Sequence, residues 1–290
     1  MKLQLHSVAA RHPAARAGAL PALQGLNLQV EAGEQLAVIG PSGAGKTTLL
    51  QVLACALPPV AGQVQLDGAD PWRLPRPALQ RLRGQLFLAP QVPPLPPRQR
   101  VVTAVLAGRL PAMGLWAGLR SLFYPHDIPA AHEALLGFDL ADKLFERVDR
   151  LSGGERQRVG LARALMAPAR LWLVDEPLSA LDPTRATQAL HTLVSQAQAR
   201  GVTLVATLHQ VDAALAHFPR IVGLRERREP RHLARALDRD QCVVTLVGDD
   251  HSRPETADDL QRQEHRRRVA LLDAHVLDGR RSSRDGVHGA

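Results

Sequence analysis

A glycine-rich loop followed by a lysine and a threonine is the part of this chain best suited to hold phosphate. Residues 40–47 fit the pattern G-x-x-x-x-G-K-[ST] and lie between an apolar strand and an expected helix. Glycines let backbone N–H groups converge on a polyphosphate, and the helix N-terminus adds a partial positive charge. Lys46 would neutralise the β- and γ-phosphates, and Thr47 would offer its hydroxyl to Mg²⁺. The expected phosphate-binding residues are Gly40, Pro41, Ser42, Gly43, Ala44, Gly45, Lys46, Thr47 and Thr48.

Two other interpretations of this loop fit less well. An ordinary glycine-rich turn leaves the preceding strand and the lysine as coincidences. A dinucleotide-binding turn needs a third glycine in G-x-G-x-x-G, which is missing after Gly43 and Gly45.

A pair of acids at the end of an apolar segment is the second candidate for chemistry. Residues 171–176 read Leu-Trp-Leu-Val-Asp-Glu. Strand ends of an open α/β sheet face the ligand crevice, so Asp175 can reach a metal ion beside Thr47. Glu176 is then placed to polarise an attacking water. Paired acids at a strand end can also be merely solvated, and the phosphate loop upstream favours the catalytic interpretation.

A serine and two glycines, starting at residue 152, stand at the N-terminus of an expected helix. Ser152, Gly153 and Gly154 would offer backbone donors to a phosphate. Glu155 lies three residues after Ser152, which is also the spacing of a helix capping box. The two interpretations are compatible, because a capped helix can bind the phosphate.

Together these segments resemble the ATPase subunits of ABC transporters. The phosphate loop, the signature-like run 151–158 and the strand 171–176 occur in that family's order and spacing. The resemblance implies ATP and Mg²⁺ as ligands and ATP hydrolysis as the reaction. It also implies that the signature of one copy closes over the ATP of a second copy, in a head-to-tail dimer.

The resemblance extends to single residues outside these motifs. Gln91 resembles the glutamine that senses Mg²⁺ and water and couples to the membrane subunit. Asp182, in the run 179–182, resembles the loop that crosses the dimer interface, and His209 resembles the histidine that contacts the γ-phosphate. The family usually stacks an aromatic ring on adenine, and here His12 takes that place. An imidazole stacks less extensively than tyrosine.

Finer similarity points to the ATPase subunits of phosphonate importers. It lies in the runs 105–109 (Val-Leu-Ala-Gly-Arg) and 208–212 (Leu-His-Gln-Val-Asp), and it covers roughly residues 1–224. The implied partners are transmembrane permease subunits and, indirectly, a substrate-binding protein, with the chain at the cytoplasmic face of the inner membrane. An importer of another small solute remains the alternative.

The elements that must position these residues read as an α/β P-loop NTPase fold with a mostly parallel sheet. Residues 3–8 and 26–30 read as an N-terminal antiparallel β subdomain. A helical subdomain is expected at about 92–160, after the proline-rich run 90–97. The remaining strands are expected at 35–39, 63–67, 86–89, 171–174, 202–207 and 220–224, and the helices at 46–57, 78–83, 154–166 and 184–200.

Composition narrows the alternatives. The chain has 290 residues, 45% of them hydrophobic, but its apolar runs are too short for a membrane helix, and we expect no signal peptide. Two cysteines are expected to be reduced thiols. The net charge of +8 fits nucleic acid, an anionic membrane face or an arginine-rich composition. With only 3% aromatic residues for stacking, we expect no nucleic-acid partner.

Two competing functions and the C-terminal segment remain to be weighed. Nucleic-acid-associated ABC ATPases generally carry a long coiled coil or two cassettes per chain, and a general P-loop kinase would leave residues 152–158 unexplained. Residues 225–290 diverge from the family pattern and are rich in Arg, Asp and His. We expect a tail there that is disordered in large part. An out-of-frame C-terminus and a regulatory appendage are both compatible with it.

Overall fold

The computed structural model describes residues 1–15, 20–224 and 243–247, without the side chains of 122–123 and 243–247. All of them belong to one compact unit, Met1–Gly248. Within these residues, no helix is both long and apolar enough to cross a membrane. Most of the expected tail therefore lies outside the described residues, and a domain boundary at residue 224 stays a prediction.

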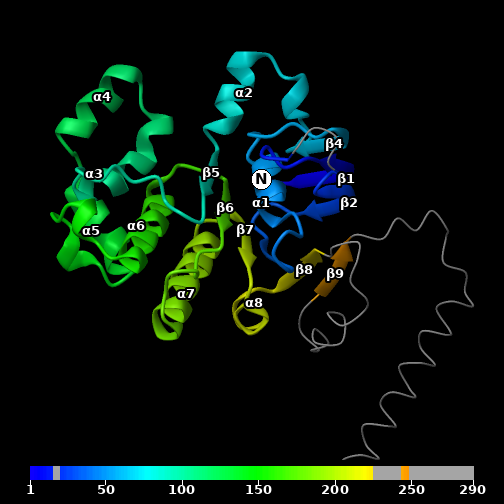
Figure 1. Cartoon of the computed structure of the whole chain (residues 1–290). Coiled ribbons are helices and arrows are strands. Elements are labelled where there is room, and N and C mark those ends of the chain that lie inside the picture. The colour runs from blue at the N-terminus through cyan, green and yellow to red at the C-terminus, as the bar shows by residue number, and fades with distance from the viewer. Residues whose placement is uncertain (16–19, 225–242, 248–290) are drawn as a thin grey trace, which may run out of the picture. The chain divides into compact units, whose positions relative to one another are not determined.

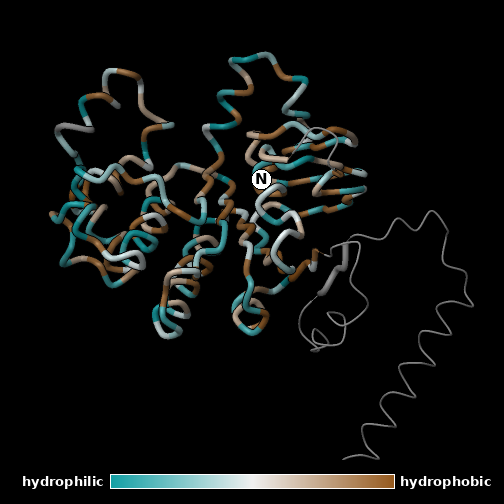
Figure 2. Tube along the Cα trace, in the orientation of Figure 1, coloured by the Kyte–Doolittle hydropathy of each residue, from teal (hydrophilic) through white to brown (hydrophobic). Residues whose placement is uncertain are grey.

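A six-stranded parallel sheet forms the centre of the unit, as the sequence predicts (Figure 1). The inner strands are buried along their whole length, which suits the near-continuous apolar runs of a sheet covered on both faces. Figure 2 shows hydrophobic colouring along these strands. In sheet order the strands are β5 (Leu86–Ala89), β6 (Leu171–Asp175), β7 (Thr203–Leu208), β3 (Gln35–Ile39), β8 (Arg220–Leu224) and β9 (Val243–Val247).

The predicted antiparallel subdomain is a three-stranded sheet in the order β2-β1-β4. Alternate residues of its strands are buried, so one face packs against α1 and the central sheet. The register of β1 shifts after Leu5, where Ser7 adopts φ 47°. The strands are β1 (Leu3–Ala10), β2 (Leu23–Val30) and β4 (Ala61–Leu66).

The helical subdomain is built on α6, against which α3 and α5 pack. Phe138 and Leu135 fill its core, and the buried Arg158 of α6 donates to the carbonyl oxygens of Phe138 (2.6 Å) and Asp139 (3.1 Å). Its helices are α3 (Val101–Leu106), α4 (Leu115–Phe123), α5 (Ile128–Leu136) and α6 (Gly153–Met166), with short 3₁₀ helices at Ala107–Ala112, Ala141–Lys143 and Val148–Arg150.

The other helices border the central sheet, and two of them depart from prediction by more than two residues. The first ends at Leu53 rather than residue 57, because the backbone turns left-handed at Cys55 (φ 56°). A short helix, α8, was not predicted. These helices are α1 (Lys46–Leu53), α2 (Arg76–Arg83), α7 (Pro183–Ala199) and α8 (Val211–His217), with a single turn at Pro71–Arg73.

Candidate functional site

The candidate site lies where β3, β6 and β7 end side by side. Asp175 pairs in register with Thr207, and Ile39 pairs with Leu208. The chain leaves β3 directly into the glycine-rich loop, β6 into Glu176 and β7 into His209. The parallel sheet thus brings three segments that are far apart in sequence to one crevice.

Close backbone approach explains a glycine of the phosphate loop. Gly45 caps α1 with φ 90°, and a Cβ there would lie 2.8 Å from both the Ala22 oxygen and the Leu23 side chain. Gly43 also has a left-handed backbone (φ 86°), but none of the described residues places an atom within 4 Å of a Cβ there. The inner side of the loop is therefore packed, while the side near Gly43 remains open. Ala44 and Thr48 are buried, and Ser42 and Thr47 are exposed.

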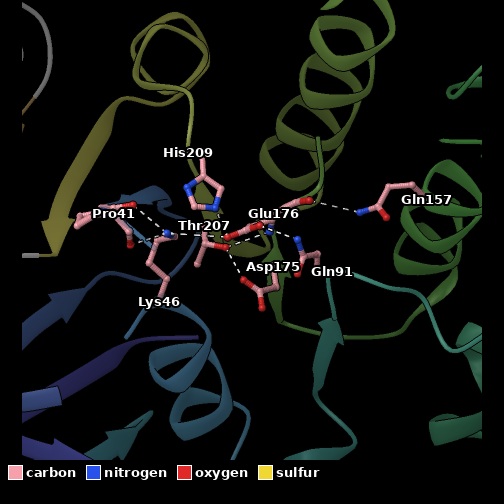
Figure 3. A network of polar contacts seen from close by, with 9 residues as sticks. Pro41, Lys46, Gln91, Gln157, Asp175, Glu176, Thr207 and His209 are labelled. Carbon is pink, nitrogen blue, oxygen red and sulfur yellow. Dashed lines mark hydrogen bonds and ion pairs between the residues drawn. The ribbon is translucent and has the colours of Figure 1, made fainter. Parts of the chain in front are cut away.

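Lys46 is buried at the centre of the site (Figure 3). Its ammonium donates to the Gly40 oxygen (2.8 Å) and the Pro41 oxygen (3.2 Å), and lies 3.9 Å from Glu176 Oε1. Burial lowers the pKa of Lys46, and the carboxylates of Glu176 and Asp175 oppose that shift. The loop's own carbonyls therefore hold the lysine beside the acids.

Glu176 is the point where most of the site's contacts meet (Figure 3). Its Oε2 accepts a hydrogen bond from Gln91 Nε2 (2.8 Å), and its Oε1 contacts His209 Nε2. Its backbone is left-handed (φ 46°), and such a conformation in a non-glycine residue occurs preferentially at functional sites. The structure thus brings the three predicted catalytic residues together.

Thr207 is a site residue that sequence analysis missed. Its buried hydroxyl donates to Asp175 Oδ1 (2.6 Å) and accepts the Glu176 N–H (3.0 Å). One hydroxyl thus orients both acids. The sequence carried no local signal for this role, because the β-branched residues around Thr207 predict only a strand.

Gln157 was also missed as a site residue, although it lies in the signature-like run. It is buried on α6, and its Nε2 donates to the carbonyl oxygen of Glu176 (3.4 Å). The helix that begins with the signature is therefore bonded directly to the backbone of the catalytic candidate.

The start of α6 has the predicted capping box. Glu155 N–H donates to Ser152 Oγ (3.2 Å), and Ser152 N–H donates to Glu155 Oε2 (2.7 Å). This bond lowers the pKa of Glu155. A Cβ at Gly154 would lie 2.7 Å from the Ala180 oxygen, whereas one at Gly153 would meet no atom of the described part of the chain within 4 Å. Ser152 and Gly153 are exposed, so this turn presents an open surface.

Two predicted ligand-binding residues lie outside the network around Glu176. Asp182 caps α7 by accepting the Arg185 N–H (3.0 Å), and that bond lowers the pKa of Asp182. His12 is exposed after β1, and its Nδ1 accepts the Ala14 N–H (3.2 Å). Among the residues that the structure describes, no contact of Asp182 or His12 links either one to the network around Glu176.

The donor chemistry of the site suits Mg²⁺. Asp175, Thr47 and Gln91 supply a carboxylate, a hydroxyl and an amide oxygen, and hard cations prefer oxygen ligands. In the described part of the chain, no group of three or more His, Cys, Asp or Glu side chains could hold a metal. Oxygen atoms of a bound phosphate would complete the coordination of a cation here, as they commonly do for Mg²⁺.

Comparisons with known proteins agree with this geometry. The ABC transporter family matches residues 23–179. Phosphonates import ATP-binding protein PhnC 2 of Albidiferax ferrireducens is 71% identical over 226 residues, covering 78% of this chain and 82% of that protein. PhnC 1 of Pseudomonas syringae pv. syringae is 51% identical over 259 residues, covering 89% and 96%.

Solved structures include similar folds. The ATP-binding cassette MJ0796, in a dimeric post-hydrolysis state with ADP and phosphate, matches with a TM-score of 0.64 and 26% identity, covering 79% of this chain and 98% of that one. The family match spans more than half of the chain, and the curated relatives align over most of their length. The chain therefore belongs to the ABC transporter family and is one of its nucleotide-binding ATPases.

Proposed function

We propose that this ATPase drives the import of a phosphonate or a related phosphorus oxyanion. The observation that carries the proposal is 71% identity, over 78% of the chain, to a phosphonates import ATP-binding protein. The residues of the candidate site are proposed to bind nucleotide and Mg²⁺, so the choice of transported solute rests on the similarity to this relative. Import of another small solute by a similar transporter is the alternative.

In this proposal the polar residues of the site divide the tasks of hydrolysis among them. The loop 40–48 binds the triphosphate through the backbone N–H groups of its residues other than Pro41, and Lys46 neutralises the outer phosphates. Glu176 accepts a proton from the attacking water, while Gln91 and His209 hold its carboxylate in place. The contacts of Glu176 with both side chains support these roles.

Mg²⁺ would be held by Thr47, Asp175 and Gln91. When bound, the ion neutralises charge on the phosphates. The Thr207 hydroxyl fixes the orientation of the Asp175 carboxylate, which supports its role as a ligand.

The nucleotide is proposed to lie between two copies arranged head to tail. Ser152, Gly153 and Gly154 of one copy would close over the triphosphate bound by its partner, and Asp182 would lie in the interface. The open side of Gly153 supports this arrangement, because no atom of the described residues lies within 4 Å of a Cβ placed there. The dimeric state described for MJ0796 agrees with it. His12 is proposed to stack on adenine.

Permease subunits and a substrate-binding protein complete the proposed transporter. The ATPase would lie at the cytoplasmic face of the inner membrane. Residues 1–224 are proposed as the ATPase domain, with a helical subdomain at about 92–160.

Reconstituted transport tests the solute. The chain would be purified with its permease, inserted into liposomes with the binding protein, and assayed for ATP hydrolysis with phosphonate, phosphite, phosphate and an amino acid. We expect stimulation by the phosphorus oxyanions and none by the amino acid. Stimulation by an unrelated solute alone would refute the phosphonate assignment.

A matched pair of substitutions tests the catalytic role. Glu176→Gln should bind ATP normally but hydrolyse it about 10²–10⁴-fold more slowly, the range of general-base catalysis. Glu133→Gln, at an exposed acid of α5, should behave like the wild type. Steady turnover by Glu176→Gln would remove Glu176 as the base.

A further inference from the structure

The positive charge of the chain is concentrated in one acid-free segment. Between Asp70 and Asp127 there are eight arginines and no Asp, Glu or Lys. The whole chain has 36 Lys and Arg against 28 Asp and Glu, so the rest has 28 of each. The entire net charge of +8 therefore lies in residues 71–126, which include α2, α3 and α4.

Most of these arginines are exposed, and half of them have no partner in the described part of the chain. Arg73 and Arg109 pair with Asp70 and Asp127, at the two ends of the segment. Arg83 and Arg100 donate only to backbone oxygens. Among the described residues of this segment, the side chains of four exposed arginines make no hydrogen bond or ion pair: Arg76, Arg81, Arg98 and Arg120.

The same segment exposes large apolar side chains on α4. Leu115 (83% exposed), Trp116 (81%) and Leu119 (49%) lie at helical i, i+1 and i+4 positions and so share one face. Gly118 is buried beneath them, and a Cβ there would lie 3.4 Å from Leu110 Cδ2. The small residue thus lets α4 rest on the subdomain while its apolar face points outward.

We propose that this basic and apolar surface binds the anionic lipid surface of the membrane. Arginines on α2 and α4 would pair with lipid phosphates, and Trp116, Leu115 and Leu119 would enter the headgroup layer. Both helices project to the upper side of the view in Figure 1, and Figure 2 shows hydrophobic positions along α4. The proposal does not depend on which solute is transported.

Charge and geometry favour lipid over a protein partner. The charged residues of this segment are all arginines and are spread over several elements. Such a surface complements a continuous layer of negative headgroups. Exposed tryptophan beside arginine on a helix is typical of interfacial membrane helices. Binding that requires the permease is the rival outcome of the test.

Sedimentation of the full chain with vesicles, in the absence of permease, tests the proposal. We expect binding to vesicles of phosphatidylethanolamine with phosphatidylglycerol, weakening with salt, and much less binding to phosphatidylcholine. Arg76→Gln and Arg81→Gln should each weaken partitioning about fivefold. The matched control is Arg150→Gln, which removes an exposed arginine outside the segment and should have little effect.

Substitutions on α4 test the apolar contribution. Trp116→Ser with Leu119→Ser should weaken partitioning about tenfold or more, whereas the exposed Phe145→Ser should not. ATP hydrolysis without vesicles should be unchanged in these variants. Tryptophan fluorescence should shift to the blue on anionic vesicles, and Trp116→Phe should abolish the shift. Equal binding to both vesicle types, binding only with permease present, or equal loss in the controls would overturn the proposal.

Discussion

Thr207→Val removes one buried hydroxyl and leaves the shape of the side chain nearly unchanged. The hydroxyl donates to Asp175 Oδ1 over 2.6 Å and accepts the Glu176 N–H over 3.0 Å. Thr207 is fully buried and Asp175 is 5% exposed, so water cannot easily replace the lost partner. Both acids of the site therefore lose a bond that orients them.

The expected magnitudes follow from these two bonds. A hydrogen bond to a charged group contributes about 1.5–3 kcal/mol to stability. The free energy of unfolding should fall by that amount, which lowers Tm by about 2–4 °C per kcal/mol in a domain of this size. If the transition state loses the same stabilisation, kcat for ATP hydrolysis should fall about 10- to 100-fold. The KM for ATP should change little, because the phosphate loop is untouched.

Steady-state ATPase kinetics with matched variants separate positioning from stability. Thr207→Ser keeps the hydroxyl and should retain most of kcat. Thr203→Val is the control, because Thr203 is equally buried on β7 but bonds to Gly33 and Met1 at the other end of the strand. It should lower Tm without a selective loss of kcat. A wild-type kcat in Thr207→Val, or an equal loss in Thr203→Val, would refute the positioning role.

Three further predictions concern packing and titration. Gly154→Ala places a Cβ 2.7 Å from an oxygen of the 179–182 loop and should lower Tm in thermal unfolding, whereas Gly153→Ala should not, having no atom within 4 Å. The lowered pKa of Glu155 means that its stabilisation is complete above pH 4.5 and is lost as pH falls through the lowered value, so Glu155→Gln should flatten acid unfolding there. Burial raises the pKa of Cys55 to about 11, so peptide-resolved mass spectrometry should find it unalkylated at neutral pH until the protein unfolds.

The parts of the fold that sequence predicted well have local signals. Strands at 35–39, 86–89 and 220–224 were predicted with the observed bounds, because short apolar runs end there at glycine, proline or charge. The helix at residue 153 was predicted one residue late, from its capping pattern. Glu176 and Lys46 could be singled out because each lies in a motif with an expected strand before it.

The parts that were missed depend on tertiary structure. Thr207 reaches Asp175 only because β6 and β7 are neighbours in this register. The sequence of neither strand predicts which strand lies next to it. Gln157 reaches Glu176 only after α6 packs on the sheet edge. The strand β9 pairs with β8 inside the segment expected to be a tail, where a single apolar island gave too weak a signal.

The hydrogen bonds of Glu176 join the sheet to the helical subdomain at a single residue. Gln91 reaches it from the proline-rich loop, and Gln157 reaches it from α6. That loop packs tightly on the same helix, since a Cβ at Gly160 would lie 2.7 Å from Pro93 Cγ. A shift of α6 against the sheet must therefore change two bonds to Glu176 together. A force on the proline-rich loop would therefore act on the orientation of the proposed base, whereas the carbonyl oxygens of the phosphate loop itself hold Lys46.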